Sequence, residues 1–327
     1  MIQIVLIGIG AGATSALLFA SIVSGSPVSF LLANFAQLPI MIAAIGWTHF
    51  AGLAAVVVAG AGLAIIFGGW IAFTFLISIA LPAWWLGYLA LLGRPAPSGE
   101  AADIEWYPVG RIVVWTAIGA AAIVIVSMMR HGIDVASMQA GLRRELEHAM
   151  RFLTGAPSGG PLRLPGVKEP ERLLDILVMV VPPMKACALA VTSLFNLWLA
   201  ARVVKISGRL RRPWPAIAQM TFPPFTAALL ALAVAATFLA DLAGLIGTVL
   251  SASLLLAYAL LGFAVVHSIT AGVGGRGFML SGLYFVVLVF GWPILIMSAL
   301  GLIETILALR ARVAARRAPP NAPINRS

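Results

Sequence analysis

The sequence predicts an all-α, polytopic transmembrane bundle of about eight or nine hydrophobic segments, some of them broken or re-entrant. Of its 327 residues, 61% are hydrophobic and only 10% are charged, and the mean hydropathy is +1.05. A soluble domain is about half apolar and a quarter charged. The apolar residues also form continuous runs, and a helix of ~20 apolar residues spans a bilayer with its backbone polar groups satisfied internally.

The basic residues lie mainly between the apolar runs. The run that ends at Arg202 is followed by four cations, Lys205, Arg209, Arg211 and Arg212. Loops rich in Lys and Arg stay on the cytoplasmic side of a membrane, so we expect residues 205–215 inside the cell. Topology therefore accounts for the net charge of +10, and the expected partner is the lipid bilayer rather than nucleic acid.

Residues 1–129 are expected to form the N-terminal membrane segments. These segments cover residues 2–24, 28–46, 50–67, 70–92 and 108–129. The first lacks the positively charged stretch of a secretory signal, so we expect it to be retained as a helix. Asn34, Gln37 and Pro39 interrupt the second, which predicts a broken or re-entrant segment.

Small residues form a stripe along the first segment. Gly8, Gly12, Ala16 and Ala20 are spaced four apart, so they share one helix face on which another helix can pack closely. The stripe predicts either packing within this chain or docking onto a separate membrane subunit. The sequence leaves both alternatives open.

Residues 130–171 are expected to lie outside the bilayer core. Between residues 134 and 153, apolar residues recur at helical spacing, and the opposite face carries charges of both signs. This pattern predicts an amphipathic helix that lies in the membrane interface or caps the protein. Residues 155–165, rich in Gly and Pro, are expected to form a linker.

Residues 172–309 are expected to form the C-terminal membrane segments, which cover residues 172–204, 219–239, 242–267 and 278–309. Pro182 and Pro183 predict that the first of these is bent or split. Residues 291–293, Gly-Trp-Pro, interrupt the last one. Residues 310–327 form a basic tail that we expect to be disordered.

Counting crossings tests this arrangement. With the N-terminus inside and one crossing per segment, residues 92–107, 205–215 and Arg276 are inside, residues 130–172 are outside, and the basic tail falls outside. That last placement conflicts with the retention of basic segments in the cytoplasm. We therefore expect residues 278–309 to turn back at Gly-Trp-Pro, or an earlier segment to be re-entrant.

Lys185 is the ionisable residue that most suggests a binding site. A charge in an apolar run costs several kcal/mol unless it is paired, hydrated or able to reach an interface. On a helix Lys185, Thr192 and Asn196 share one face, which predicts a substrate-binding site for an anionic or polar solute. Alternatively, Lys185 and Arg202 extend to opposite interfaces and bind no solute.

No catalytic residues, metal site or cofactor are predicted. Cys187 is the only cysteine, which excludes an intramolecular disulfide and leaves no paired cysteines for zinc or an iron–sulfur cluster. Gly272, Gly274 and Gly277 form a GxGxxG pattern, but no strand precedes them. The phosphate loop, zinc helix and nucleophile elbow motifs are absent from the sequence, so an enzyme is the least supported class.

Several short motifs support a family resemblance. They are Asn196-x-Trp198, Arg202-Val203, Ser207-Gly208, Arg212-Pro213, and Gly301-Leu302-x-Glu304 leading to Arg310. With these motifs the chain resembles the YybS-like family of uncharacterised bacterial membrane proteins, a domain-of-unknown-function group, although Glu304 stands where Asp is more usual.

That family is distantly similar to the S components of energy-coupling-factor transporters. The first helix of those components uses an AxxxA motif against the coupling subunit, and Ala16-x-x-x-Ala20 matches it. The resemblance implies a multi-pass protein of the bacterial inner (plasma) membrane. The small-residue stripe, the broken helices and Lys185 make the leading hypothesis an S-component-like subunit that binds or transports a small solute. The alternative is a non-transporting scaffold or assembly protein, and the third hypothesis is a membrane-embedded enzyme.

Overall fold

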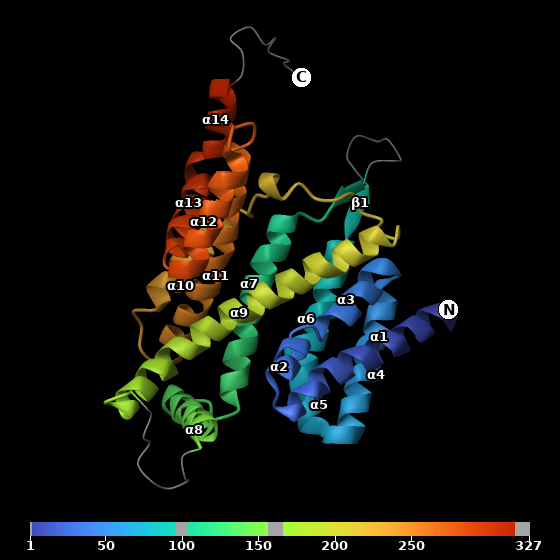
Figure 1. Cartoon of the computed structure of the whole chain (residues 1–327), viewed down its shortest axis with the longest axis vertical. Helices are drawn as coiled ribbons and strands as arrows, with labels where there is room; N and C mark the ends of the chain where they lie inside the picture. The colour runs from blue at the N-terminus through green and yellow to red at the C-terminus, as the bar shows by residue number, and fades with distance from the viewer. Residues whose placement is uncertain (1, 96–103, 156–165, 318–327) are drawn as a thin grey trace.

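The computed structural model describes residues 2–95, 104–155 and 166–317. In these ranges the chain is a bundle of helices with one two-stranded sheet (Figure 1). Among the described residues, seven helical stretches are long and apolar enough to cross a membrane, or eight if the bent pair Pro293–Leu307 and Leu309–Arg316 is one span. The predicted all-α polytopic bundle is confirmed.

The N-terminal group contains the first four candidate spans. Its elements are α1 (Ile2–Ala20), η1 (Ser21–Ser24), α2 (Pro27–Ala33), α3 (Gln37–Gly46), α4 (His49–Phe67), α5 (Gly69–Phe75), η2 (Leu76–Ala80) and α6 (Leu81–Ala90). The second span is interrupted at residues 34–36, between α2 and α3, but residues 27–46 still form one candidate span. The Ser15 hydroxyl of α1 donates a hydrogen bond to the Ala36 carbonyl at this break.

The middle of the chain forms a hairpin and three helices. Its elements are β1 (Gly93–Pro95), β2 (Ile104–Trp106), α7 (Val109–Met129), α8 (Val135–Thr154) and α9 (Pro170–Ile206). The strands are antiparallel, with Gly93 opposite Trp106. Helix α8 is the predicted amphipathic helix, and it ends at Gly155, whose φ of 66° is left-handed. The rest of the expected linker, residues 156–165, lies outside the described residues.

Of the two alternatives predicted for α9 at the proline pair, a bend or a split, the structure excludes the split. Pro182 and Pro183 lie inside one continuous helix of 37 residues, so the segment is not split there. Each proline removes one backbone donor. Membrane helices tolerate this loss where neighbouring helices pack against the proline, and Pro182 is buried.

The C-terminal group follows α9. Its elements are η3 (Ile217–Gln219), α10 (Phe225–Ala236), α11 (Asp241–Ile269), α12 (Arg276–Phe290), α13 (Pro293–Leu307) and α14 (Leu309–Arg317). Helix α10 starts later than predicted because Pro223 and Pro224 disfavour helical backbone in the residues before them. The tail also differs from its prediction, since α14 is helical, while residues 318–327 lie outside the described part of the chain.

Helices α12 and α13 form a hairpin that turns back within the bundle. Arg276, at the start of α12, donates to the His267 carbonyl near the end of α11. The chain reverses at Gly291, whose φ is 70°, and after α13 Arg310 donates to the carbonyls of Ala218 and Met220. Each helix has 15 residues, about 22 Å, which is shorter than the ~30 Å hydrocarbon core. The chain thus enters and leaves this hairpin at one end of the bundle.

Helix α9 joins the two helix groups. Figure 1 shows it crossing the molecule diagonally, with α1–α6 on one side and α10–α13 on the other. Its residues Ala200 and Val204 belong to the core formed by α3–α6, and Leu194 packs against the core formed by α7, α10 and α11. The two groups therefore have separate cores that share α9.

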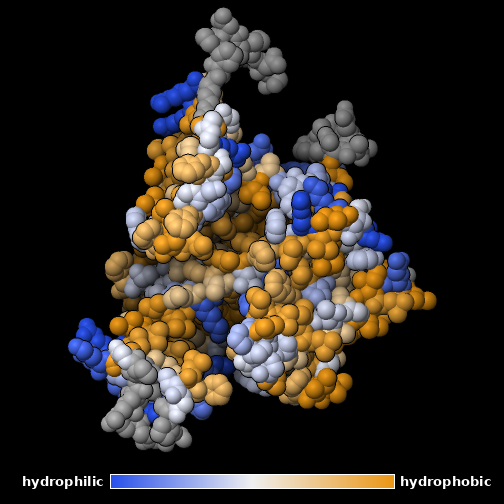
Figure 2. Space-filling model, in the orientation of Figure 1, coloured by the Kyte–Doolittle hydropathy of each residue, from blue (hydrophilic) through white to orange (hydrophobic). Residues whose placement is uncertain are grey.

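The outer surface is predominantly apolar. Figure 2 shows hydrophobic residues over most of the visible face. Large side chains such as Ile65, Phe238, Phe278 and Leu288 are each at least 85% exposed. Such a surface requires hydrocarbon rather than water around it, so these helices contact the lipid bilayer.

Candidate functional site: a cavity between the two helix groups

A cavity of about 650 Å³ lies where the two helix groups meet beside α9. Its walls come from the ends of α3 and α6, from α7, α9, α11 and α12, and from the loop after α9. Large apolar side chains dominate the lining, among them Val113, Leu194, Leu197, Trp198, Trp214 and Phe263. Small-molecule sites typically occupy ~300–1,000 Å³ and are mostly apolar, so this cavity has the size and lining of a ligand site.

Helix periodicity places the lining residues of α9. Leu194, Leu197, Trp198 and Ala201 follow one another at i, i+3, i+4 and i+7, so they form one stripe along the helix. The stripe extends over about 10 Å. Because α9 ends at Ile206, the cavity reaches from near the helix end into the apolar part of the bundle.

The loop from Ser207 to Pro224 covers this end of the cavity. Gly208 adopts a φ of 68° just after α9, which turns the chain back over the bundle. Trp214 then lies beside two cations, with Lys205 Nζ 4.9 Å and Arg202 Cζ 5.7 Å from its ring centroid. Arg209 lies over Trp47 at 4.7 Å. These cation–π contacts hold the loop against both α9 and the N-terminal group.

Arg212 is a half-buried cation on the cavity wall. Its Nη1 donates to the Ala90 carbonyl at 3.1 Å, one of the last carbonyls of α6, which lack intrahelical donors. Burial lowers the pKa of Arg212 from its ordinary value. A guanidinium nevertheless stays protonated in proteins, so Arg212 brings a positive charge to the cavity.

Arg276 brings a second guanidinium to the same cavity. Its Nη2 donates to the His267 carbonyl at 3.1 Å, and its Nε is buried without a hydrogen-bond partner among the described residues. His267 also lines the cavity, and its Nε2 is hydrogen-bonded to the Tyr284 hydroxyl at 2.8 Å. No acidic residue lies among the described lining residues, and neither arginine forms a salt bridge within the described part of the chain.

A buried ion pair between α13 and α14 lies beside the cavity. Arg310 Nε lies 2.7 Å from Glu304 Oε1, and the Arg310 amide donates to Glu304 Oε2 at 3.1 Å. The other guanidinium nitrogens reach the carbonyls of Ala218 and Met220 at 2.7 and 2.9 Å. Glu304 and Arg310 thereby connect α13 and α14 to the loop segment that lines the cavity.

The three residues predicted to bind a solute, Lys185, Thr192 and Asn196, do not line a common pocket. Lys185 lines a separate pocket of about 30 Å³, together with Arg130, His131 and Glu145. That volume holds about one or two water molecules. Lys185 is therefore grouped with residues at the α8 end of the bundle.

Asn196 lies deeper in the bundle and makes structural contacts. Its side-chain amide donates to the Asn34 carbonyl at 2.8 Å and to the Thr192 carbonyl at 2.9 Å. Asn34 is at the break between α2 and α3, so Asn196 supplies a donor to irregular backbone within the membrane. Neither Thr192 nor Asn196 lines the pocket that contains Lys185 or the large cavity.

The small-residue stripe of α1 packs against this chain. A Cβ added at Gly8 would lie 2.5 Å from the Ala54 Cβ, and one at Gly12 would lie 2.6 Å from the Ala55 carbonyl. Ala16 and Ala20 pack against the core of the N-terminal group. Of the two alternatives for Gly8, Gly12, Ala16 and Ala20, the geometry favours internal packing with α4.

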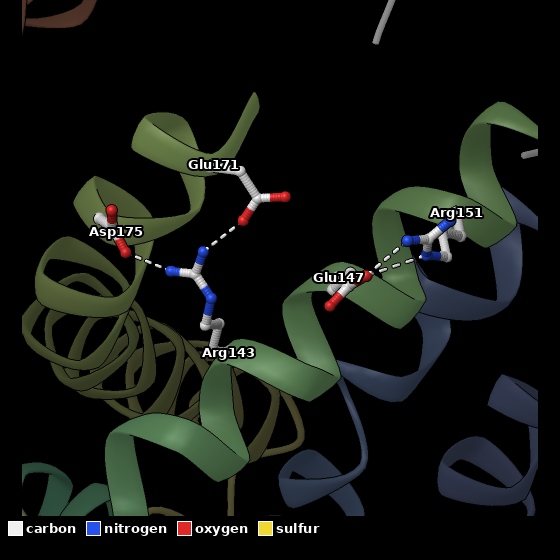
Figure 3. Close-up of polar contacts among 5 residues, drawn as sticks. All are labelled: Arg143, Glu147, Arg151, Glu171 and Asp175. Atoms are coloured by element: carbon white, nitrogen blue, oxygen red, sulfur yellow. Dashed lines mark hydrogen bonds and ion pairs between the residues drawn. The ribbon is translucent and has the colours of Figure 1, made fainter. Parts of the chain in front are cut away.

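The charged face of α8 pairs largely with its own surroundings. Arg143 bridges Glu171 and Asp175 at the start of α9, while Arg151 pairs with Glu147 one turn earlier on α8 (Figure 3). Arg130 pairs with Glu145. On the other face Met138 is fully buried. Helix α8 therefore caps the bundle end where α7 finishes and α9 begins.

Most of the chain matches one known protein family. Residues 13–305 match the family described as predicted membrane protein (DUF2232). The chain belongs to the DUF2232 family. No curated protein and no solved structure matches it. The DUF2232 match includes every described lining residue of the large cavity and Glu304, whereas Arg310 lies beyond its end.

The cavity arginines of this DUF2232 member were visible in the sequence only as orientation signals. Arg212 belongs to a basic loop, and Arg276 follows a glycine-rich turn. Their shared cavity depends on α9 and α11 ending at the same end of the bundle, which no local pattern shows. The sequence contained one signal for this site: Arg212 and Arg276 each lie next to an apolar segment and have no acidic residue nearby in the sequence.

Proposed function

We propose that this membrane protein is an S-component-like solute-binding subunit, and that its binding site is the cavity beside α9. The single observation that carries the proposal is this cavity of about 650 Å³, whose walls belong to both helix groups and to the loop between them. Ligand sites in helical membrane proteins lie where helix groups meet. A movement of one group against the other would open or close the site.

Transport by such a subunit requires a separate energising partner. The sequence has no GxxxxGK[ST] phosphate loop with which to bind and hydrolyse a nucleotide. The resemblance to the YybS-like family and to S components supports this division of labour, and it supports placement in a bacterial inner membrane. The partner would bind outside the Gly8–Ala20 stripe, because α4 already occupies that face.

The scaffold alternative has less structural support. It relied on the outward face of α8 and on the basic loops. The described charges of α8 pair largely within the chain, and the loop after α9 is held by its own cation–π contacts. Both features thus have roles in the fold itself.

A matched pair of tryptophan substitutions on α9 tests the proposal. Ala201 lines the cavity, whereas Ala188 is exposed on the same helix. Protein purified in mild detergent is analysed by native mass spectrometry for bound small molecules. We expect bound mass in the wild type and in Ala188→Trp, and at least a 10-fold lower occupancy in Ala201→Trp because the indole fills the cavity.

Thermal unfolding of both variants separates a filled cavity from a damaged fold. Equal occupancy in Ala201→Trp and Ala188→Trp, with both folded, would contradict the proposal. Absence of bound mass from the wild type, even after incubation with cell extract, would contradict it as well.

A further inference from the structure

The cavity has a polar end and an apolar end. Arg212 lies in the loop after α9, and Arg276 begins α12 after the end of α11. Both contact carbonyls near helix C-termini, Ala90 of α6 and His267 of α11. The guanidiniums therefore occupy the end of the bundle where these helices finish, and the apolar lining from Leu194 to Ala201 extends inward from it.

The charge of this polar end is not balanced by the protein. The described lining contains two guanidiniums and no carboxylate, and neither guanidinium takes part in a salt bridge within the described residues. Partly buried cations are costly without an anionic partner or strong hydrogen bonds. The unpartnered buried Nε of Arg276 leaves a donor free for such a partner.

From this arrangement we propose that the cavity binds an amphipathic anion. Its phosphate or carboxylate head would contact Arg212 and Arg276, and its alkyl or isoprenoid-like body would lie along α9 between Leu194 and Ala201. Guanidinium groups match both head groups geometrically, and the apolar wall favours a hydrocarbon body. The inference rests on the proposed solute-binding function and specifies its ligand class.

Helix α12 forms one wall of the cavity and contacts α11 through a pair of aromatic residues. Tyr284 of α12 stacks on Phe263 of α11 with ring centroids 5.3 Å apart, and its hydroxyl binds His267. Helix α12 has no buried residue of its own, so it is the wall least held by packing. A ligand that arrives from the bilayer can therefore reach the cavity by displacement of α12 without disruption of a core.

The test uses dodecyl phosphate as the probe, with dodecanol as its neutral analogue and inorganic phosphate as its head alone. Affinity for the full chain in mild detergent is obtained from the rise in unfolding temperature with probe concentration. We expect dodecyl phosphate to bind at least 10-fold more tightly than either comparison compound. Equal binding of dodecanol, or equal binding of inorganic phosphate, would overturn the proposal.

Substitution of the two arginines tests the polar end. Arg212→Gln and Arg276→Gln are each expected to weaken dodecyl phosphate binding by about 10-fold or more, the effect of losing one charge-assisted hydrogen bond. Dodecanol binding should stay unchanged. Arg211→Gln is the matched control, because Arg211 is exposed and does not line the cavity. Arg212→Lys should retain part of the affinity.

The variants also separate this inference from the proposed function. If Ala201→Trp abolishes binding of both dodecyl compounds while the glutamine variants bind them normally, the cavity is a ligand site but its ligand is not anionic. If Ala201→Trp changes neither, the proposed function fails as well. Nanodiscs with and without phosphatidylglycerol distinguish two sources of the amphipathic anion. If the probe fails to bind only when phosphatidylglycerol is present, the site belongs to a bilayer lipid. If probe binding is unchanged, the ligand is a smaller amphipathic anion.

Discussion

Glu304 and Arg310 form the most deeply buried ion pair among the described residues, with side chains only 8% and 14% exposed. Both residues belong to the motif Gly301-Leu302-x-Glu304 leading to Arg310, and the ion pair gives that motif a structural role. Arg310 uses its remaining donors on Ala218 and Met220, so one side chain connects α13, α14 and the loop over the cavity. Loss of the carboxylate would leave a largely buried guanidinium without its counter-ion.

Glu304→Ala should lower the free energy of unfolding by about 3 kcal/mol, because removal of one member of a buried pair strands the other charge. Thermal unfolding in detergent measures the change. Glu105→Ala is the control, since the Arg94–Glu105 pair is exposed and such pairs contribute little. Equal unfolding temperatures for the two variants would contradict the structural role of Glu304.

Asp134 fixes the start of α8 in a way that depends on pH. Its carboxylate accepts hydrogen bonds from the Ser137 amide at 2.8 Å and the Ser137 hydroxyl at 2.7 Å. These bonds lower the pKa of Asp134 below its ordinary value. A depressed pKa means that the stabilisation is fully present above the ordinary carboxyl range and is lost as pH falls through the lowered value.

We therefore expect hydrogen exchange at the first turn of α8, corrected for intrinsic rates, to accelerate as the pH falls below about 4. In Asp134→Asn the amide still caps the helix but does not titrate in this range. Its exchange protection should stay constant over the same pH interval. A wild-type profile that matches the Asn variant would refute the role of the carboxylate.

At the scale of elements, α11 and α13 approach each other through glycine. A Cβ added at Gly301 would lie 2.0 Å from the Tyr258 carbonyl, and one at Gly262 would lie 2.0 Å from the Met297 carbonyl. The Ser298 hydroxyl, beside this contact, donates to the Leu255 carbonyl at 2.7 Å. Close approach of this kind favours helix association in membranes through van der Waals packing.

Gly301→Ala should destabilise the protein by about 1–3 kcal/mol, because the methyl group forces the two helices apart. Gly282→Ala on α12 is expected to change stability in the opposite direction, because an added Cβ there would have no neighbouring atom within 4 Å. There the substitution should raise stability by about 0.5–1 kcal/mol through helix propensity. Thermal unfolding of both variants checks the pair, and a neutral Gly301→Ala would contradict the close packing.

Local sequence patterns predicted most helices and none of the cavity. The segment expected over residues 108–129 is α7, Val109–Met129, because a continuous apolar run needs no tertiary information to be identified. The proline pair does not split α9, because a membrane helix tolerates the loss of backbone donors where neighbouring helices pack against it. Arg212 and Arg276 are 64 residues apart in sequence (276 − 212), and only the shared end point of α9 and α11 brings them to one cavity.

At the scale of the whole molecule, the α12–α13 hairpin removes the topological conflict found in the sequence. Because the chain enters and leaves this hairpin at one end, Arg276 and the α14 arginines lie at the same end as the loop after α9. Helix α8, with charges of both signs, caps the other end. The distribution then follows the retention of basic segments on the cytoplasmic side.

Cysteine accessibility in intact cells measures this arrangement. In a Cys187→Ala background, single cysteines at Arg209, Gly274 and Arg316 should react with an impermeant maleimide only after the cells are permeabilised. A cysteine at Ala140, exposed on α8, should react in intact cells. Reaction of the Arg316 position on the side opposite to Arg209 would show that α12 and α13 together form one crossing and do not turn back at Gly291.

The cavity beside α9 is the proposed ligand site, and its cationic end is formed by Arg212 and Arg276. An experimental density map of the wild-type protein, extracted in native lipid without detergent exchange, tests this directly. We expect non-protein density beside α9 that reaches from Leu194 toward Arg212 and Arg276 and is absent from the Ala201→Trp variant. A cavity filled by inward movement of α12, or one that holds only water in the wild type, would contradict the account.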